Sequence, residues 1–213
     1  DPEDTGDDGV VEEPPDETGS PADTGAPEDT GEAPPAVIPV EPIYVHTSST
    51  LYSLEPTTGT LSLVGDFYAG TEDAFGGSMT DIAIDSDGYV YGIGFTGLYG
   101  IDPTDARVWE IAALDQDFVG LTATSDGRLI GAGDGLYEIN TATGLTAPLV
   151  DAGMYQTSGD IVGLPSSLLY WLVRGDEDSG DLLVEVDATS GVTSEVGSVG
   201  VTKLFGVAYS GGS

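Results

Sequence analysis

The sequence predicts an all-β domain made of four repeated units, preceded by an acidic segment that does not fold on its own. Three observations support this prediction: a hairpin motif that recurs four times, turn residues placed between short apolar runs, and a sharp change in composition near residue 42. The chain has 213 residues, and the part after residue 42 is long enough to form one domain with its own core.

Residues 1–42 form the acidic segment, with 14 acidic residues and no basic or aromatic residue. An acidic residue followed by Thr and Gly recurs four times, at Asp4–Gly6, Glu17–Gly19, Asp23–Gly25 and Asp29–Gly31. Such a segment cannot bury enough apolar surface to offset the entropy lost on ordering. Its Pro, Gly and like charges favour an extended chain. We therefore expect a disordered linker or stalk at 1–42 and a folded domain at 43–213.

The hairpin motif begins with a short strand of apolar and aromatic residues and then breaks at a turn. Its four copies are Leu51–Gly59, Leu98–Asp105, Leu136–Gly144 and Leu183–Gly191. An Asp, Asn or Glu caps each turn, and a Gly, where present, supplies a positive φ. A second β-rich run follows every turn, so each copy is predicted to be a β-hairpin. The four leading leucines should occupy equivalent positions.

A second hairpin precedes three of these copies. Ile82–Tyr91 and Leu121–Ile130 share an Asp-Gly turn between apolar runs, which is a strong hairpin signal. Ile161–Trp171 fills the same position with a Pro-Ser-Ser turn. Each full unit therefore has four short antiparallel strands, the arrangement typical of a propeller blade.

The two ends of the domain complete the fourth unit. Phe205–Tyr209 has the pattern of an innermost strand, and Ile43–Val45 has the pattern of the next strand. We expect these two segments to pair, so that a split blade closes the ring and removes exposed strand edges.

The repeats across residues 43–213 resemble the β-propeller superfamily, and the Leu-Tyr-x-Ile-Asp hairpin is similar to that of many extracellular and periplasmic propellers. The resemblance implies a small four-bladed β-propeller and no particular activity. A fragment of a larger propeller and an open β-sandwich remain alternatives. The composition of residues 1–42 resembles the spacer of bacterial surface lipoproteins, which implies a secreted or cell-surface location.

Charge and composition exclude several classes of function. The formal net charge of −34 disfavours nucleic acid and anionic membranes as partners. No apolar run is long enough to span a membrane. The chain has no Cys, which excludes a thiol nucleophile and a thiolate metal site. Ordinary solubility and adaptation to high salt both explain the charge.

No catalytic or cofactor-binding residue can be assigned. His46 is the only histidine and lies in no catalytic motif. With one histidine and no acidic position expected to be shared by the inner strands, a metal-dependent enzyme is the weaker interpretation. The best metal candidates are Asp176, Asp178 and Asp181, closely spaced carboxylates that suit calcium. A solvated acidic loop is the alternative.

Four aromatic residues in predicted loops are the candidates for binding a partner: Phe67, Tyr68, Phe75 and Tyr155. Tyr68 and Phe75 belong to the glycine-rich stretch Tyr68–Ser78, which is expected to be a flexible loop, and core packing is the alternative fate of each ring. We predict a non-enzymatic, surface-displayed binding or assembly module that recognises another cell-surface or extracellular protein through loops of one propeller face. A carbohydrate-binding module and a metal-dependent hydrolase or lactonase are the alternatives.

Overall fold

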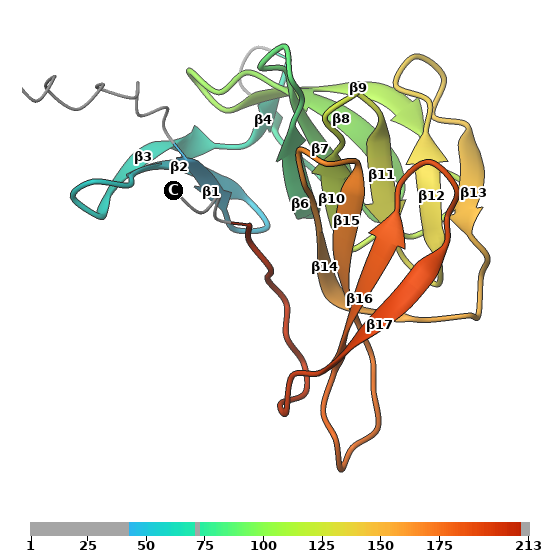
Figure 1. Cartoon of the computed structure of the whole chain (residues 1–213). Coiled ribbons are helices and arrows are strands. Elements are labelled where there is room, and N and C mark those ends of the chain that lie inside the picture. The colour runs from blue at the N-terminus through green and yellow to red at the C-terminus, as the bar shows by residue number, and fades with distance from the viewer. Residues whose placement is uncertain (1–42, 71–72, 210–213) are drawn as a thin grey trace, which may run out of the picture. The chain divides into compact units, whose positions relative to one another are not determined.

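The computed structural model describes residues 43–70 and 73–209 of the chain. The stalk predicted at 1–42 lies outside the described residues. All regular secondary structure in the described part is β-strand, arranged in four mainly antiparallel sheets that we number blades 1 to 4 in chain order (Figure 1). The predicted all-β, four-bladed propeller arrangement is confirmed.

The blades follow the repeats of the sequence. Blade 1 contains β1 (Ile43–His46), β2 (Thr50–Glu55) and β3 (Thr60–Asp66). Blade 2 contains β6 (Met79–Ile84), β7 (Val90–Gly94), β8 (Gly97–Ile101) and β9 (Arg107–Ala113). Blade 3 contains β10 (Gly120–Ala123), β11 (Leu129–Ala132), β12 (Leu136–Ile139) and β13 (Thr146–Val150). Blade 4 contains β14 (Thr157–Gly163), β15 (Leu168–Val173), β16 (Leu182–Asp187) and β17 (Thr193–Ser198).

Blade 2 is wider than the repeat predicts. Two additional short strands, β4 (Tyr68–Ala69) and β5 (Asp73–Ala74), pair with each other, and β4 also pairs in parallel with β9. The segment expected to be a flexible loop is therefore partly held at the outer edge of this blade.

The strand register confirms that the four leucines of the hairpin motif are equivalent. In every blade the pairing of the last two strands shifts directly after this leucine: at Leu51/Tyr52, Leu98/Tyr99, Leu136/Tyr137 and Leu183/Val184. A β-bulge at the same place in all four blades bends each sheet in the same way. The repeat is therefore a repeat of backbone geometry as well as of sequence.

The hairpin turns use a left-handed residue at their end. Gly59, Gly144 and Gly191 have φ values of 67°, 72° and 70°. The second copy places Ala106 there instead, at φ 65°. Glycine adopts this conformation without the steric cost that other residues incur.

Gly191→Ala is expected to destabilise the domain more than Gly59→Ala. Both substitutions place a side chain at positive φ, which costs about 1 kcal/mol. A Cβ at Gly59 meets no atom within 4 Å, whereas a Cβ at Gly191 overlaps the carbonyl of Leu149 on blade 3. We expect a loss of about 1 kcal/mol for the first variant and at least about 2 kcal/mol for the second. Urea unfolding followed by tryptophan fluorescence measures both, and equal losses would contradict the contact between the turn of blade 4 and blade 3.

Apolar side chains fill three junctions between neighbouring blades. Leu51 of blade 1 packs with Val90 and Ile101 of blade 2. The next junction joins Leu98 of blade 2 to Ile139 of blade 3. The third joins blade 3 to the fully buried Trp171 and other core residues of blade 4. The core is therefore a series of layers between blades.

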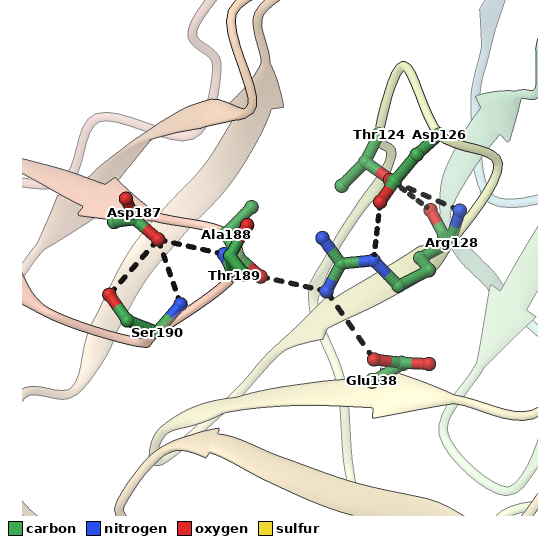
Figure 2. A network of polar contacts seen from close by, with 8 residues as sticks. All are labelled: Thr124, Asp126, Arg128, Glu138, Asp187, Ala188, Thr189 and Ser190. Carbon is green, nitrogen blue, oxygen red and sulfur yellow. Dashed lines mark hydrogen bonds and ion pairs between the residues drawn. The ribbon is translucent and has the colours of Figure 1, made fainter.

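Arg128 adds polar contacts to the junction between blades 3 and 4 (Figure 2). Its Nη1 donates a hydrogen bond of 2.7 Å to the carbonyl oxygen of Ala188 on blade 4. The same guanidinium pairs with Asp126 at 3.1 Å and with Glu138 at 3.5 Å. Both carboxylates belong to blade 3, so they orient the guanidinium toward the neighbouring blade.

The junction between blade 4 and blade 1 is not packed like the other three. Three residues after the motif leucine, Ile101, Ile139 and Val186 are buried, but Leu54 of blade 1 is only half-buried. Ile43 of β1 is 47% exposed. On the opposite side of the junction, Leu183 is half-buried.

The strand pairing predicted to close the ring is not formed. Strand β1 pairs only with β2, and residues 205–209 belong to no strand. The backbone donors of this segment are used on blade 4 instead. The N–H of Leu204 donates to Asp181 at 2.9 Å, and the N–H of Val207 donates to Asp160 at 3.0 Å. The segment is thus attached to β14 rather than added to the sheet of blade 1.

Candidate functional site

A cavity of about 630 Å³ opens at one end of blades 3 and 4. Its wall comes from the loop before β10, the loop between β11 and β12, the beginning of β14, the end of β15 and the C-terminal segment. The lining residues are Thr80, Asp115, Gln116, Asp117, Val119, Gly133, Asp134, Gln156, Thr157, Ser158, Gly159, Arg174 and Phe205. They come from parts of the chain up to 125 positions apart, between Thr80 and Phe205, so the fold alone creates this site.

The wall of this cavity carries hydrogen-bond acceptors and donors of several kinds. Two carboxylates are oriented by neighbouring side chains: Asp115 accepts a hydrogen bond of 3.2 Å from Thr146, and Asp134 accepts one of 3.1 Å from Tyr137. The side-chain amides of Gln116 and Gln156 add both donors and acceptors. The cavity can therefore hydrogen-bond a ligand that carries many hydroxyl groups.

Phe205 supplies the large apolar surface of the cavity. Its side chain is 75% exposed. Its backbone lies directly against Gly159 of β14, where a Cβ would overlap the Cα of Phe205 and the carbonyl of Leu204. Glycine at position 159 is what lets the C-terminal segment approach β14 so closely. The exposed ring is consequently fixed to the wall through its main chain.

A second cavity of about 590 Å³ adjoins the first and shares Ser158, Arg174 and Phe205 with it. Its remaining lining residues are Gly175, Glu177, Asp181, Thr202 and Lys203. Two of the chain's four basic residues therefore line one cavity. The two cavities form one continuous candidate site on this face.

The buried carboxylate of Asp181 stabilises the wall of the second cavity. It is only 3% exposed, and its carboxylate accepts hydrogen bonds from the Ser158 hydroxyl and the Leu204 N–H. Burial opposes ionisation, but hydrogen bonds from Ser158 and from backbone N–H groups outweigh it and lower the pKa of Asp181. The ionised carboxylate thus holds the C-terminal segment in place.

The structure does not bring the calcium candidates together. Among the described residues, no three His, Cys, Asp or Glu side chains are grouped so that they can hold a metal ion. Of the predicted set Asp176, Asp178 and Asp181, the third is buried and committed to Ser158 and Leu204. Close spacing in the sequence therefore did not produce a shared site, because the loop turns Asp181 inward.

The four aromatic candidates take part in packing contacts. Phe67 is only 2% exposed, so it cannot present its ring to a partner. The half-buried Phe75 packs edge-on against Tyr99, with ring centroids 4.9 Å apart. The half-buried Tyr68 and Tyr155 donate hydrogen bonds to Asp105 and Glu195. The exposed aromatic residue of the site is Phe205, which the sequence suggested only as a strand residue.

A pair of acidic residues on the inner strands was missed by the sequence analysis. Asp81 on β6 accepts the N–H of Leu121 on β10 at 2.6 Å, and Asp160 on β14 accepts the N–H of Val207 at 3.0 Å. Each also accepts the N–H of the isoleucine that follows it. The expectation that the inner strands share no acidic position was therefore wrong. The signal was the Asp-Ile pair at the same place in Thr80–Ile82 and Gly159–Ile161.

The charge of Asp81 opposes the ionisation of Asp160, and both carboxylates lie near the single histidine. Burial first, and then the charge of Asp81, raise the pKa of Asp160 to about 6. His46 Nε2 is 3.8 Å from an oxygen of Asp81. Burial lowers the pKa of His46, but the hydrogen bonds with Asp81 and the Thr47 carbonyl and the nearby carboxylate charges raise it overall. Through these backbone N–H groups, Asp81 links β6 to β10, and Asp160 holds the C-terminal segment to β14.

No helix in the described part of the chain has the length and apolar character needed to cross a membrane. No protein-family model and no curated protein matches the sequence. The fold is nevertheless shared with solved structures. A Bacteroides thetaiotaomicron protein of unknown function matches with a TM-score of 0.58 and 15% identity, over 73% of this chain and 44% of that one.

Two further solved structures share the fold. Hydrazine synthase of Kuenenia stuttgartiensis has a TM-score of 0.51 and 10% identity, over 73% of this chain and 46% of its own. An auxiliary nutrient binding protein of B. thetaiotaomicron has a TM-score of 0.50 and 15% identity, over 75% of this chain and 40% of its own. The chain spans less than half the length of these proteins. Likeness at this identity establishes the fold alone, and the fold of this chain is a four-bladed β-propeller.

Proposed function

We propose that this domain is a non-enzymatic, surface-displayed binding module that takes a small polar ligand in the cavity at the end of blades 3 and 4. The observation that carries the proposal is the cavity itself, of about 630 Å³, with hydrogen-bonding side chains and one exposed aromatic ring. Its volume lies within the range of roughly 300–1,000 Å³ that is usual for small-molecule sites.

The chemistry of the wall favours a saccharide or another polyhydroxylated ligand. Carboxylates and amides make directional hydrogen bonds to hydroxyl groups. The exposed ring of Phe205 offers an apolar surface on which the C–H face of a sugar ring can lie. This combination is available at the cavity and not at the four aromatic residues that the sequence suggested.

Recognition of another extracellular or cell-surface protein is the second candidate. A 75% exposed phenylalanine on a well-held segment is the kind of anchor that a protein partner buries. A loop or chain end of such a partner would enter the same cavity, so both candidates use the same residues.

The non-enzymatic part of the proposal rests on how the inner carboxylates are used. The oxygens of Asp81 and Asp160 accept backbone N–H groups from their own strands, from β10 and from the C-terminal segment. These hydrogen bonds account for two of the roughly four lone-pair positions of each carboxylate and fix it to the backbone. We assign these groups to the scaffold and the cavity groups to binding.

Phe205→Ala is expected to weaken ligand binding by about tenfold, because an aromatic surface buried by a ligand contributes on the order of 1–2 kcal/mol. Calorimetric titration of the full chain with a panel of neutral and acidic oligosaccharides measures the effect. Phe95→Ala is the matched control, because Phe95 is 54% exposed and lies outside the cavity. No binding by any member of the panel would reject the saccharide proposal, and equal losses in the two variants would place the ligand elsewhere.

A further inference from the structure

The basic residues of this chain are few, and two of them form no ion pair with the residues that the structure describes. The sequence has four basic residues against 38 acidic ones. Arg128 is engaged with Asp126, Glu138 and the Ala188 carbonyl (Figure 2). Arg107 lies 4.0 Å from Asp102 and over the ring of Trp109. Within residues 43–70 and 73–209, Arg174 and Lys203 form no ion pair, although acidic side chains are abundant.

These two unpaired cations lie in the same cavity. Both Arg174 and Lys203 line the second cavity, and Arg174 also lines the first. They come from different parts of the chain, the end of β15 and the C-terminal segment. A chain with so few cations therefore places half of them at one opening, beside Glu177 and Asp181 but without an ion pair within 4.0 Å among the described residues. An anionic group of a ligand could pair with both cations.

The backbone holds both cations at this opening. Lys203 has a φ of 62°, a left-handed conformation that a residue with a long side chain rarely adopts. The next residue is fixed by the hydrogen bond from the Leu204 N–H to the buried carboxylate of Asp181. The N–H of Arg174 donates to the carbonyl of Gln156 at 2.8 Å. Strain of this kind persists where the surrounding structure imposes it, and it is concentrated at functional sites.

The neighbouring groups define which anion fits. Glu177 and Asp181 line the same cavity, so a doubly charged phosphate would meet more repulsion than a singly charged carboxylate. Arg174, Ser158 and Phe205 connect this cavity to the one whose wall binds hydroxyl groups. A ligand that joins a carboxylate to a polyol ring matches both cavities at once.

We propose that the ligand of this face is an acidic saccharide of the hexuronic acid type, whose carboxylate is bound by Arg174 and Lys203. This inference rests on the proposed saccharide-binding function and adds the charge of the ligand to it. Arg174 can bind a carboxylate through two parallel N–H donors, and Lys203 adds a third donor.

The test compares matched ligands on the full chain. Calorimetric titration with a galacturonic acid oligosaccharide and with the galactose oligosaccharide of the same length measures the preference. We expect the acidic ligand to bind about tenfold more tightly, as for hydrogen bonds between charged groups. The double variant Arg174→Gln/Lys203→Gln is expected to remove this preference, because it lowers the affinity for the acidic ligand about tenfold more than the affinity for the neutral ligand. Arg107→Gln, outside the cavity, should keep the preference.

Each other outcome overturns one of the two proposals. Equal binding of the acidic and neutral ligands rejects the carboxylate site and leaves saccharide binding intact. Binding of neither ligand rejects both. A galactose 6-phosphate competitor that displaces the acidic ligand better than galacturonate does would show that the cations select phosphate. A preference that survives the double variant would place the anion at another position.

Discussion

Leu98→Ala is expected to lower the free energy of unfolding by about 3 kcal/mol, whereas Leu183→Ala is expected to lower it by about 1 kcal/mol. The two leucines hold the same place in the repeat, directly before the bulge of their blades. Leu98 is completely buried in the junction between blades 2 and 3. Leu183 belongs to none of the three buried clusters that join neighbouring blades and is only half-buried. The difference in cost follows from the cavity that truncation leaves in one junction and not in the other.

Urea unfolding of the two variants side by side measures this difference. Leu136→Ala is the control that should behave like Leu98→Ala, because Leu136 is also completely buried and packs in the junction between blades 3 and 4. A loss at Leu183 as large as that at Leu98 would contradict the half-buried position of Leu183. It would indicate that blades 4 and 1 pack together in solution as tightly as the other pairs.

The sequence was sufficient to predict the blades because their signals are local. A motif leucine, a capped turn and an Asp-Gly hairpin each specify a few neighbouring residues, and the repeat of these signals places them in register. The structure confirms the equivalence of the four leucines at the level of single bulges. Turn chemistry and strand alternation therefore carry most of the information about this fold.

The closing strand could not be predicted in the same way. Residues 205–209 have the pattern of a strand, but their placement depends on the carboxylates of Asp160 and Asp181, which lie 47 and 23 positions away from their partners Val207 and Leu204. These two carboxylates bind backbone donors of the segment directly. Which acceptor the backbone N–H groups of this segment find depends on the packed structure. The local sequence pattern therefore does not reveal it.

The candidate site could not be predicted from the sequence either, and the reason is physical. Its wall combines residues from three blades and the C-terminal segment, each of which is unremarkable in its own stretch of sequence. The acidic loop at Asp176–Asp181 was a calcium candidate because its carboxylates are close in sequence. In the structure Asp181 shapes the site as a buried acceptor, and Glu177 lines the second cavity. The informative signal was the scarcity of cations, because it made the positions of Arg174 and Lys203 unusual.

The stability of the domain is expected to fall as the pH rises from about 4 to about 6, and Asp160 is expected to account for about 2 kcal/mol of that fall. Burial and the charge of Asp81 raise the pKa of Asp160 to about 6 in the folded state, from an ordinary value of 3.8. The folded state therefore binds a proton more tightly than the unfolded state. This contribution is fully present below pH 3.8 and is lost as the pH passes through 6. A shift of about two units corresponds to about 3 kcal/mol, which partial exposure of the group reduces.

Asp160→Asn isolates this contribution, because it removes the titrating group at nearly unchanged volume. The variant loses one acceptor for the backbone N–H groups of Ile161 and Val207, which lowers stability by an amount that does not vary with pH. The difference in unfolding free energy between wild type and variant, measured by urea unfolding at intervals between pH 4 and 7, should therefore change by about 2 kcal/mol and then level off above pH 6.

Two further variants test the neighbours of Asp160. His46 faces Asp81 and is also influenced by Asp160, so His46→Gln is measured alongside to separate its own titration. Asp81→Asn should lower the pKa of Asp160, as followed by NMR of its side-chain carboxyl carbon, because it removes the nearby negative charge. A difference between wild type and Asp160→Asn that stays constant from pH 4 to pH 7 would show that this carboxylate ionises in the folded domain as readily as in the unfolded chain.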